Sequence, residues 1–360
     1  MDVLDHISQK LTDVASIKSF LNAYKIRYNG NSLNIEQADE ILEMKTSERD
    51  FFQVTPFKFK HRNFTKDFEF FKQFVPGGIK RISLLKEDGE CCKIFGIFYR
   101  GKNDKMVIED EHDFIELNLE KCKDNLFLAE NMFVCVKGTK EDEQFYVINA
   151  FLPKPPLATH CNKFLEKKPL KICFFSNFTT EDDFIKRAVK LHTPNLIVMS
   201  VRKELNNKKF HVPTIICRTE NPACLLPVQN EIKRENISCY SHKTNKSFIK
   251  STNPCLIEIY DKTILFLDYN ICKYKEEGVF LNENPLESFI RGFISQLSAN
   301  PFSKSGLRLK TQPDFIILAQ NVKPFVLKVD NTIVISIPYI NKNGYGIIKT
   351  DTLDAEVFFE

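Results

Sequence analysis

The most informative ten residues of this 360-residue chain are Lys250-Ser251-Thr252-Asn253-Pro254-Cys255-Leu256-Ile257-Glu258-Ile259. Proline fixes its own φ and moves the preceding residue out of the helical region, so Asn253-Pro254 predicts a turn. A short apolar run follows at once. A second apolar run, at 263–267, begins after the charged pair Asp261-Lys262. This pattern predicts two strands joined as a β-hairpin.

The composition indicates an ordered protein with more than one hydrophobic core. Apolar residues make up 43% of the chain, and 33 Phe residues supply most of its aromatic bulk. A chain of this length can form two or three cores. No apolar run approaches the roughly 20 residues of a membrane helix. The start, Met1-Asp2-Val3-Leu4-Asp5, lacks the basic and apolar segments of a secretory signal, so we expect a cytosolic or nuclear protein without a membrane partner.

The eleven cysteines favour a reduced protein. Their odd number prevents complete pairing, and no C-x-x-C spacing occurs. Most lie in apolar runs, as Cys135 does between Val134 and Val136. Such cysteines are ordinarily buried free thiols. We therefore expect no zinc site.

Charge is unevenly distributed along the chain, whose net charge is +4. Residues 77–152 contain 11 Lys and Arg against 15 Asp and Glu, whereas residues 153–360 contain 29 against 21. A mild basic excess permits contact with phosphates, although a solvated lysine-rich surface has the same composition.

Hydrophobic spacing predicts four parts: an N-terminal helical domain (1–46), a connector (47–76), a small β-barrel (77–156) and a layered α/β domain (157–360). In the first part, Asn34 and Gln37 form a capping pattern for a second helix. One face of the first helix carries the apolar residues Leu4, Ile7, Leu11, Val14, Ile17 and Leu21.

The connector is expected to be irregular, with Phe interleaved with Lys and Arg. This composition suits either stacking on single-stranded nucleic acid or, as we favour, fixing the connector to a neighbouring domain.

Short strands punctuated by turn residues predict the barrel, and an OB-fold suits their number. The expected strands are 79–85, 92–99, 105–108, 114–117, 132–136 and 144–151. From about residue 168 the period changes to strand, helix, strand, which indicates a βαβ unit. Its helix is capped by Thr180 and buries Phe184, Ala188 and Leu191. Further strands are expected at 210–217, 314–319 and 332–337, and a further helix at Pro285.

A barrel followed by a layered domain resembles the B (second, non-catalytic) subunits of eukaryotic replicative DNA polymerases, most closely the epsilon type. The Thr252-Asn253-Pro254 segment followed by Cys255 resembles the epsilon-type motif, and Pro313-Asp314 with Pro324-Phe325 resembles a late strand and loop. The resemblance implies an OB-fold joined to an inactivated calcineurin-like phosphoesterase domain, giving an α+β and α/β multidomain chain.

The segments that would hold two catalytic metals lack the necessary ligands. A two-metal site requires paired carboxylates and imidazoles. Here the expected segments read Phe175-Ser176-Asn177-Phe178-Thr179, Val198-Met199-Ser200-Val201, His211-Val212-Pro213-Thr214-Ile215 and Leu318-Ala319-Gln320-Asn321-Val322. His211 is interpreted as structural. The string Asp110-Glu111-His112 lies in the barrel and is interpreted as chance. We predict no catalytic, metal or cofactor-binding residue and no cofactor, and the sequence does not identify partner-binding residues.

The resemblance therefore implies a nuclear, non-catalytic accessory subunit of the DNA polymerase epsilon complex in DNA replication. Its implied partners are the C-terminal zinc-binding region of the catalytic subunit, components of the replicative helicase reached through residues 1–46, and DNA weakly or indirectly. The alternatives are a B subunit of the delta or alpha polymerase, a divergent metal-dependent phosphodiesterase or nuclease, and a free single-strand-binding protein.

Overall fold

The structure is a computed structural model. It describes residues 52–56, 63–101, 104–122, 124, 126–157, 169–178, 183–201, 212–218, 248–259, 262–268, 271, 278–280, 285–299, 308–319, 323–338 and 344–359. The predicted helical domain 1–46, Thr180 and His211 lie outside these residues.

Five strands close into a barrel in the order β2-β3-β4-β7-β6. Neighbouring strands are antiparallel except β4 and β7, which are parallel. This five-stranded Greek-key arrangement is that of an OB-fold, so the predicted barrel is confirmed. The strands are β2 (Cys92–Arg100), β3 (Met106–Glu109), β4 (Phe114–Asn118), β6 (Met132–Glu141) and β7 (Gln144–Phe151).

The strand expected at 79–85 is wrong. Only Ile79 forms a bridge, to Lys93, and the short 3-10 helix η1 (Ile82–Leu84) follows. The Ile82 N–H donates to the buried Asp110 carboxylate (2.8 Å) rather than to a neighbouring strand. A side chain far along the sequence therefore replaces the β-ladder partner that the apolar pattern suggested.

The predicted connector contains regular structure and is not irregular throughout. Its helix α4 (Phe64–Lys72) is capped by the Asn63 side chain, which accepts from the Lys66 N–H (3.0 Å). Phe68 and Phe71 of α4 are buried against the barrel, with ring centroids 5.0 Å from Phe95 and Phe133 respectively. These contacts support the interpretation that the phenylalanines fix the connector to a neighbouring domain.

Two six-stranded mixed sheets form the layered domain. The first has the order β1-β12-β13-β15-β17-β16 and the second β11-β10-β9-β8-β18-β19. The first sheet comprises β1 (Phe52–Pro56), β12 (Cys255–Ile259), β13 (Lys262–Leu267), β15 (Phe315–Ala319), β16 (Phe325–Val329) and β17 (Thr332–Ile337). The second comprises β8 (Lys171–Phe178), β9 (Leu196–Val201), β10 (Thr214–Arg218), β11 (Phe248–Ser251), β18 (Gly344–Lys349) and β19 (Ala355–Phe359).

The predicted local units are present in these sheets. Strands β12 and β13 form the expected antiparallel hairpin. Strands β8 and β9 are parallel and are connected through α5 (Asp183–His192), as a βαβ unit requires. The helix, however, buries Ile185 and Ala188, while Leu191 is 73% exposed, so the predicted burial of Leu191 is wrong. Leu191 lies in the last turn of α5, near where the helix ends at His192.

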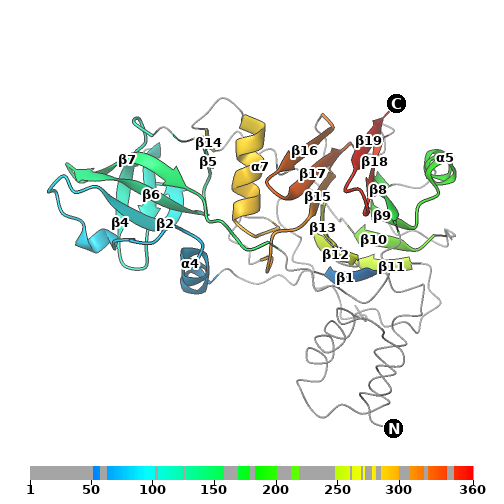
Figure 1. The fold of residues 1–360 in the computed structure, drawn as a ribbon, viewed down its shortest axis with the longest axis horizontal. Coiled ribbons are helices and arrows are strands. Elements are labelled where there is room, and N and C mark those ends of the chain that lie inside the picture. Colours follow the sequence, from blue (N-terminus) through cyan, green and yellow to red (C-terminus); the bar gives the residue numbers. More distant parts are fainter. Residues whose placement is uncertain are drawn as a thin grey trace, which may run out of the picture.

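The layers follow one another along the long axis of the molecule (Figure 1). Helix α5 covers the outer face of the second sheet, and a continuous apolar core fills the space between the two sheets. Helix α7 (Pro285–Ser295) lies between the first sheet and the barrel. This arrangement confirms the layered α/β architecture that the resemblance implied.

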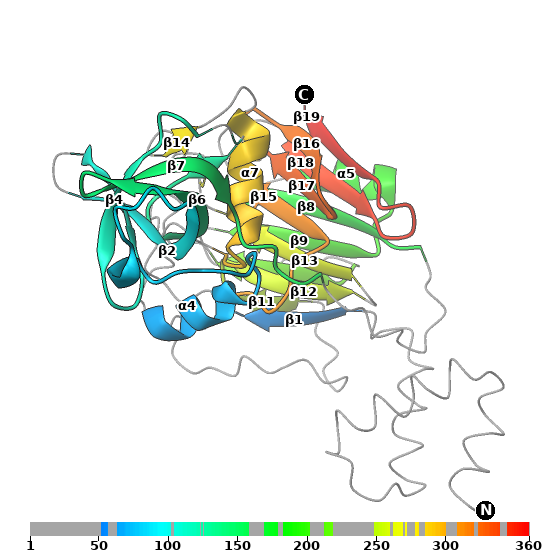
Figure 2. The same cartoon turned by 60° about the vertical axis from the view of Figure 1, so that its left-hand side comes forward.

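The barrel and the first sheet share a single hydrophobic core (Figure 2). Strand β5 (Phe127–Leu128), in the connection between barrel strands β4 and β6, pairs with β14 (Val279–Phe280), and the ring of Phe127 lies 5.1 Å from that of Phe289 on α7. Gln296, just beyond α7, accepts from the Phe133 N–H (2.8 Å) and donates to the Phe133 carbonyl (3.0 Å). Apolar packing and directional hydrogen bonds therefore both hold the barrel against α7 and the first sheet.

We expect Gln296→Leu to lower the free energy of unfolding by about 1–3 kcal/mol, because it removes three buried hydrogen bonds, two to the Phe133 backbone and one to the Ser295 hydroxyl, at nearly constant volume. Urea unfolding followed by circular dichroism measures this change. Gln73→Leu is the matched control, since the Gln73 amide donates only to the exposed Glu69 carbonyl. Equal unfolding midpoints for the two variants would contradict the role given to Gln296.

Candidate functional site

The ends of β8 and β9 carry buried hydroxyl groups where a phosphoesterase of the resembled kind would place metal ligands. Ser176 and Ser200 are both fully buried. The Ser176 hydroxyl donates to the Pro338 carbonyl (2.8 Å), just after β17, and so connects the second sheet to the first. A hydroxyl used in this way holds the sheets together and is a poor ligand for a divalent cation, which prefers carboxylate or imidazole.

Within the described ranges, no three His, Cys, Asp or Glu side chains converge as ligands for a metal ion. Asn177 is the penultimate residue of β8, and its side chain lies outside the part of the chain that is described, as do Thr179, Gln320 and Asn321. The absence of a catalytic metal therefore stays a prediction that rests on residue type at the segments named above.

The string Asp110-Glu111-His112 has a structural role. One oxygen of the buried Asp110 carboxylate accepts from the N–H groups of His112 (2.8 Å) and Asp113 (2.9 Å), while the other accepts from Ile82. Asp110 thus closes the turn between β3 and β4 and fixes η1 to it. With its oxygens used by backbone donors, the string is not a metal-binding motif.

The Thr252-Asn253-Pro254 turn carries the chain from the second sheet to the first. It connects β11 to β12, and the Asn253–Pro254 bond is cis. The Asn253 side chain accepts from the Asp268 N–H (2.8 Å) and donates to the Asp268 carbonyl (2.7 Å), at the end of β13. An Asn at this position therefore holds the crossover against the neighbouring strand.

Two buried cysteines meet beside this turn. Cys217 on β10 and Cys255 on β12 are both fully buried, and their Sγ atoms lie 3.3 Å apart across the two sheets. Burial raises the pKa of the Cys217 thiol well above its usual value, and the hydrogen bond with Cys255 raises it further. Cys217 is consequently protonated, and both buried thiols form part of the core. Sequence spacing could not have paired residues 38 positions apart on different sheets.

The barrel face that binds oligonucleotides in OB-folds is acidic in this chain. In such folds the second and third strands, with the loops between strands one and two and between strands four and five, form the binding face. Here the second and third strands, β3 and β4, carry Glu109 and Glu116, and residues 141–143 at the loop between the last two strands read Glu141-Asp142-Glu143. The loop 101–105 between the first two strands contains Lys102 and Lys105 against Asp104, so acidic residues outnumber basic ones by six to two. Lys105 is engaged by Glu116 (2.6 Å). This negative charge disfavours phosphates at the usual OB face.

Comparison with known proteins identifies the barrel. Residues 41–154 match the family model described as "DNA polymerase epsilon subunit 2-like, OB-fold domain", which is about a third of the chain. The match agrees with the closed OB topology over 92–151. The chain therefore contains an OB-fold domain like that of polymerase B subunits. A search of the curated proteins gives no significant match.

Among solved structures, a novel archaeal phosphodiesterase is similar to part of this chain, at 15% identity and a TM-score of 0.31. The similarity covers 53% of this chain and 100% of that one. A second structure is 12% identical with a TM-score of 0.31, over 53% of this chain and 99% of its own. Neither similarity is strong enough to support a function.

The burial of the thiols predicts an order of chemical modification. Desolvation raises the pKa of Cys135 to about 11 and that of Cys173 to about 12, so both remain protonated at pH 8. Because the thiolate is the nucleophile, we expect iodoacetamide at pH 8 to modify the exposed Cys91 and to leave Cys135, Cys173 and Cys217 intact until denaturant is added. Peptide mass spectrometry measures this order among the seven cysteines of the described ranges, and among these seven Cys91→Ser should lose the fast reaction. Rapid labelling of Cys173 in the folded protein would contradict the burial.

Proposed function

We propose that this chain is a non-catalytic accessory subunit of a replicative DNA polymerase, of the epsilon type, acting as a scaffold in chromosomal replication. The observation that supports the proposal most strongly is the family match on the same residues that close into the OB barrel. The epsilon assignment follows the matched family and the Cys255 that succeeds Asn253-Pro254; the delta and alpha types remain the alternatives within this class.

A scaffold of this kind needs a large surface with fixed geometry. The barrel is joined to the layered domain through a shared core, paired strands and the Gln296 bridge. Two domains joined by a small interface ordinarily move relative to one another. An interface of this kind restricts that motion. A partner that contacts both domains would therefore meet a preformed surface and lose little free energy in ordering it.

The proposed partners are the C-terminal zinc-binding region of the polymerase catalytic subunit and, through residues 1–46, components of the replicative helicase. The proposed location is the nucleus. Both proposals come from the resemblance of the whole domain order. The unit 1–46 is too small to bury much apolar surface by itself, which is consistent with a segment that docks onto a partner.

Deletion of residues 1–46 tests the assignment of the two partners. We expect the truncated chain to fold and to retain the catalytic subunit, because described residues of the barrel and the layered domain form a shared core. We expect helicase components to be lost or weakened. Co-purification from cells, read by mass spectrometry against the full chain, measures both. Loss of the catalytic subunit with retention of helicase components would show that the two interfaces are reversed.

A metal-dependent phosphodiesterase is the competing function of another class. We expect the purified chain to bind less than one equivalent of Mn²⁺ and to show no hydrolysis of a phosphodiester substrate above a buffer control, because Ser176 and Ser200 stand where ligands are needed. Metal analysis after dialysis against Mn²⁺ and a chromogenic diester assay measure these quantities. Two bound metals per chain with turnover would overturn the scaffold proposal.

A further inference from the structure

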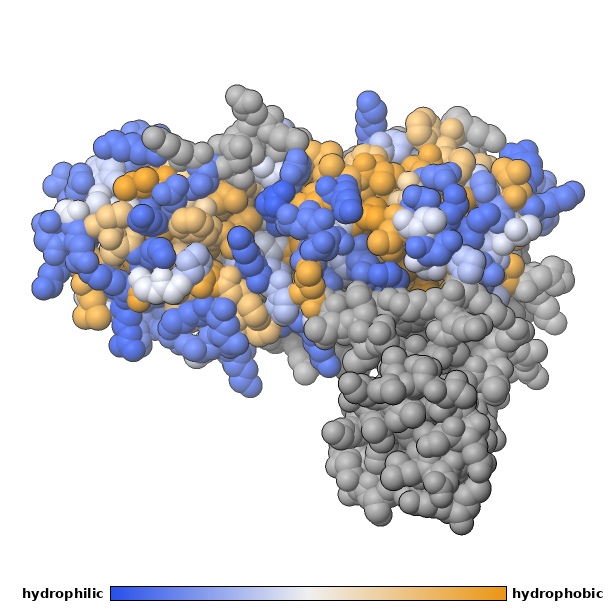
Figure 3. All heavy atoms as spheres, viewed as in Figure 1, coloured by the Kyte–Doolittle hydropathy of each residue, from blue (hydrophilic) through white to orange (hydrophobic). Residues whose placement is uncertain are grey.

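We propose that the free edge of β19 pairs with the same edge of a second copy of this chain, across a twofold axis. Strand β19 ends the second sheet, and within the described ranges no strand pairs with its outer edge. Apolar side chains are exposed beside this edge: Phe359 is 65% exposed, and Val326 on β16, the edge strand of the first sheet, is 45% exposed. Figure 3 shows hydrophobic side chains on the surface over β16 and β19. Exposed apolar area of this kind ordinarily marks an interface.

The hydrogen bonds between β18 and β19 establish which backbone groups of β19 face outward. The Lys349 N–H donates to the Asp354 carbonyl (2.9 Å), and these two residues lie opposite each other in the register of the two strands. Hydrogen-bonded and non-hydrogen-bonded pairs alternate along an antiparallel ladder. Glu356 and Phe358 therefore bond to β18. The residues whose N–H and C=O groups face the free edge are Ala355, Val357 and Phe359.

Strand β19 lacks the residues that usually prevent an edge strand from pairing with another chain, which are above all Lys and Pro. Among the four edge strands of the two sheets, β1 ends with Pro56, β11 carries Lys250 and β16 carries Lys328, whereas β19 contains no Lys, Arg or Pro. The one charged residue of β19, Glu356, lies on the outer face of the sheet, 3.3 Å from Lys349. This edge is therefore open to a further strand.

The sequence of β19 fits a second copy of itself in one register. With the twofold axis at Val357, the outward-facing residues pair as Val357 with its own copy and Ala355 with Phe359, so that a small side chain lies beside the exposed ring. On the outer face, Glu356 then lies opposite Phe358 of the second copy. Moving the axis by one residue places Glu356 opposite either its own copy or the last residue, which is also acidic. Like charges directly opposite each other destabilise a sheet, so the register centred on Val357 is favoured.

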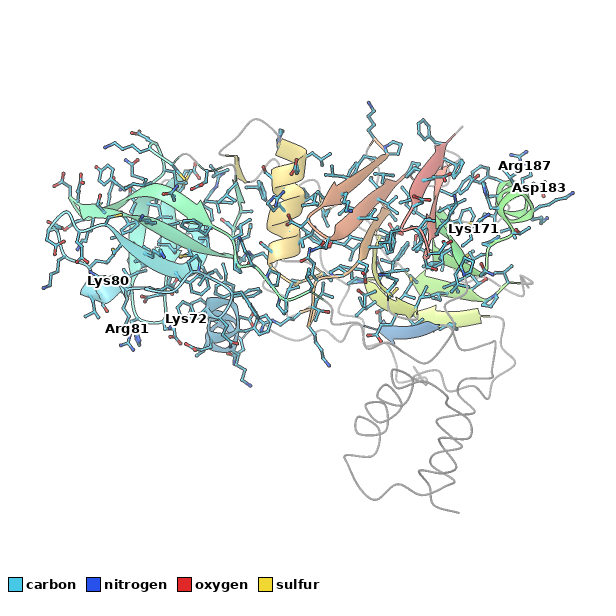
Figure 4. All side chains as sticks on the ribbon, viewed as in Figure 1. Lys72, Lys80, Arg81, Lys171, Asp183 and Arg187 are labelled. Carbon is cyan, nitrogen blue, oxygen red and sulfur yellow. The ribbon has the colours of Figure 1, made fainter. Side chains whose placement is uncertain are left out.

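The size and chemistry of this contact predict a weak dimer that is insensitive to salt. Two paired strands of five residues, with Val326 covered beside them, involve fewer residues than the roughly 20–30 on each side of a standard interface. The contact consists of backbone hydrogen bonds and apolar side chains. The charged side chains of α5 do not take part in it, because Asp183 and Arg187 project from α5 on the side away from β19 (Figure 4). We therefore expect association that depends on protein concentration and little on ionic strength.

The test is sedimentation velocity of the full chain in reducing buffer, at protein concentrations from about 5 to about 500 µM. We expect monomer at the low end and a growing dimer fraction at the high end. Val357→Pro removes an outward N–H from both copies without removing a bond to β18, and Phe359→Lys places a charge in the apolar row. Each should raise the dissociation constant about tenfold or more.

Two control variants match these changes. Phe114→Lys makes the same replacement at a ring that is 63% exposed on β4 of the barrel, and it should dimerise as the native chain does. Val357→Thr keeps both the N–H and the branched shape, and it should dimerise nearly as the native chain does. Far-ultraviolet circular dichroism checks that each variant is folded, and Phe359→Lys still tests the proposal if Val357→Pro does not fold.

Hydrogen exchange locates the contact, because the amides of residues 350–360 should exchange more slowly at the high protein concentration. A chain that stays monomeric at about 500 µM would overturn the proposal, as would dimers that Val357→Pro and Phe359→Lys leave unchanged. Loss of the polymerase catalytic subunit from Phe359→Lys would also overturn it, by assigning the edge to that subunit. Retention of the catalytic subunit by this variant separates the inference from the proposed function.

Discussion

The shared core between the barrel and the first sheet is the constraint on which the rest of the molecule depends. A barrel of about 60 residues has few apolar residues to bury alone, and this one shares its core with α7 and the outer face of the first sheet. Gln296 adds directional hydrogen bonds to this apolar packing. Strand β7 pairs with β6 from Cys135 onward, and Gln296 binds the Phe133 backbone just beyond the point where that pairing ends. The register of the barrel and the position of α7 are therefore fixed together.

The connector serves both halves of the molecule. Strand β1 forms the edge of the first sheet beside β12, while α4, a few residues later, packs on the barrel through Phe68 and Phe71. Arg308 reinforces this link from the layered domain, because its guanidinium pairs with Asp67 and lies over the ring of Phe70 (4.6 Å). A segment that contacts two domains in this way opposes hinge motion between them, as a scaffold requires.

Local patterns predicted much of the fold, because they are set by neighbouring residues. Alternating strands separated by Gly and Asp gave the five barrel strands within a few residues, and the change of period near 168 gave the βαβ unit. These local patterns could not predict which strands pair when they lie far apart in the sequence. Strands β18 and β19 were not predicted, yet β18 pairs antiparallel with β8, and its glycines pack closely enough that a Cβ at Gly344 would collide with Pro338. Strand β1 was hidden in a connector that had been expected to be irregular, because a five-residue edge strand needs its partner β12 to be recognised.

At the candidate site, too, the residue types could be read from the sequence, but the contacts that those residues make could not. The sequence predicted that the segments at the ends of β8 and β9 lack metal ligands, but only the structure shows that Ser176 connects the two sheets through the Pro338 carbonyl. It likewise shows that Asp110 serves three backbone donors and that Cys217 meets Cys255. The side chains of Ser176, Asp110 and Cys217 therefore all make structural contacts inside the protein.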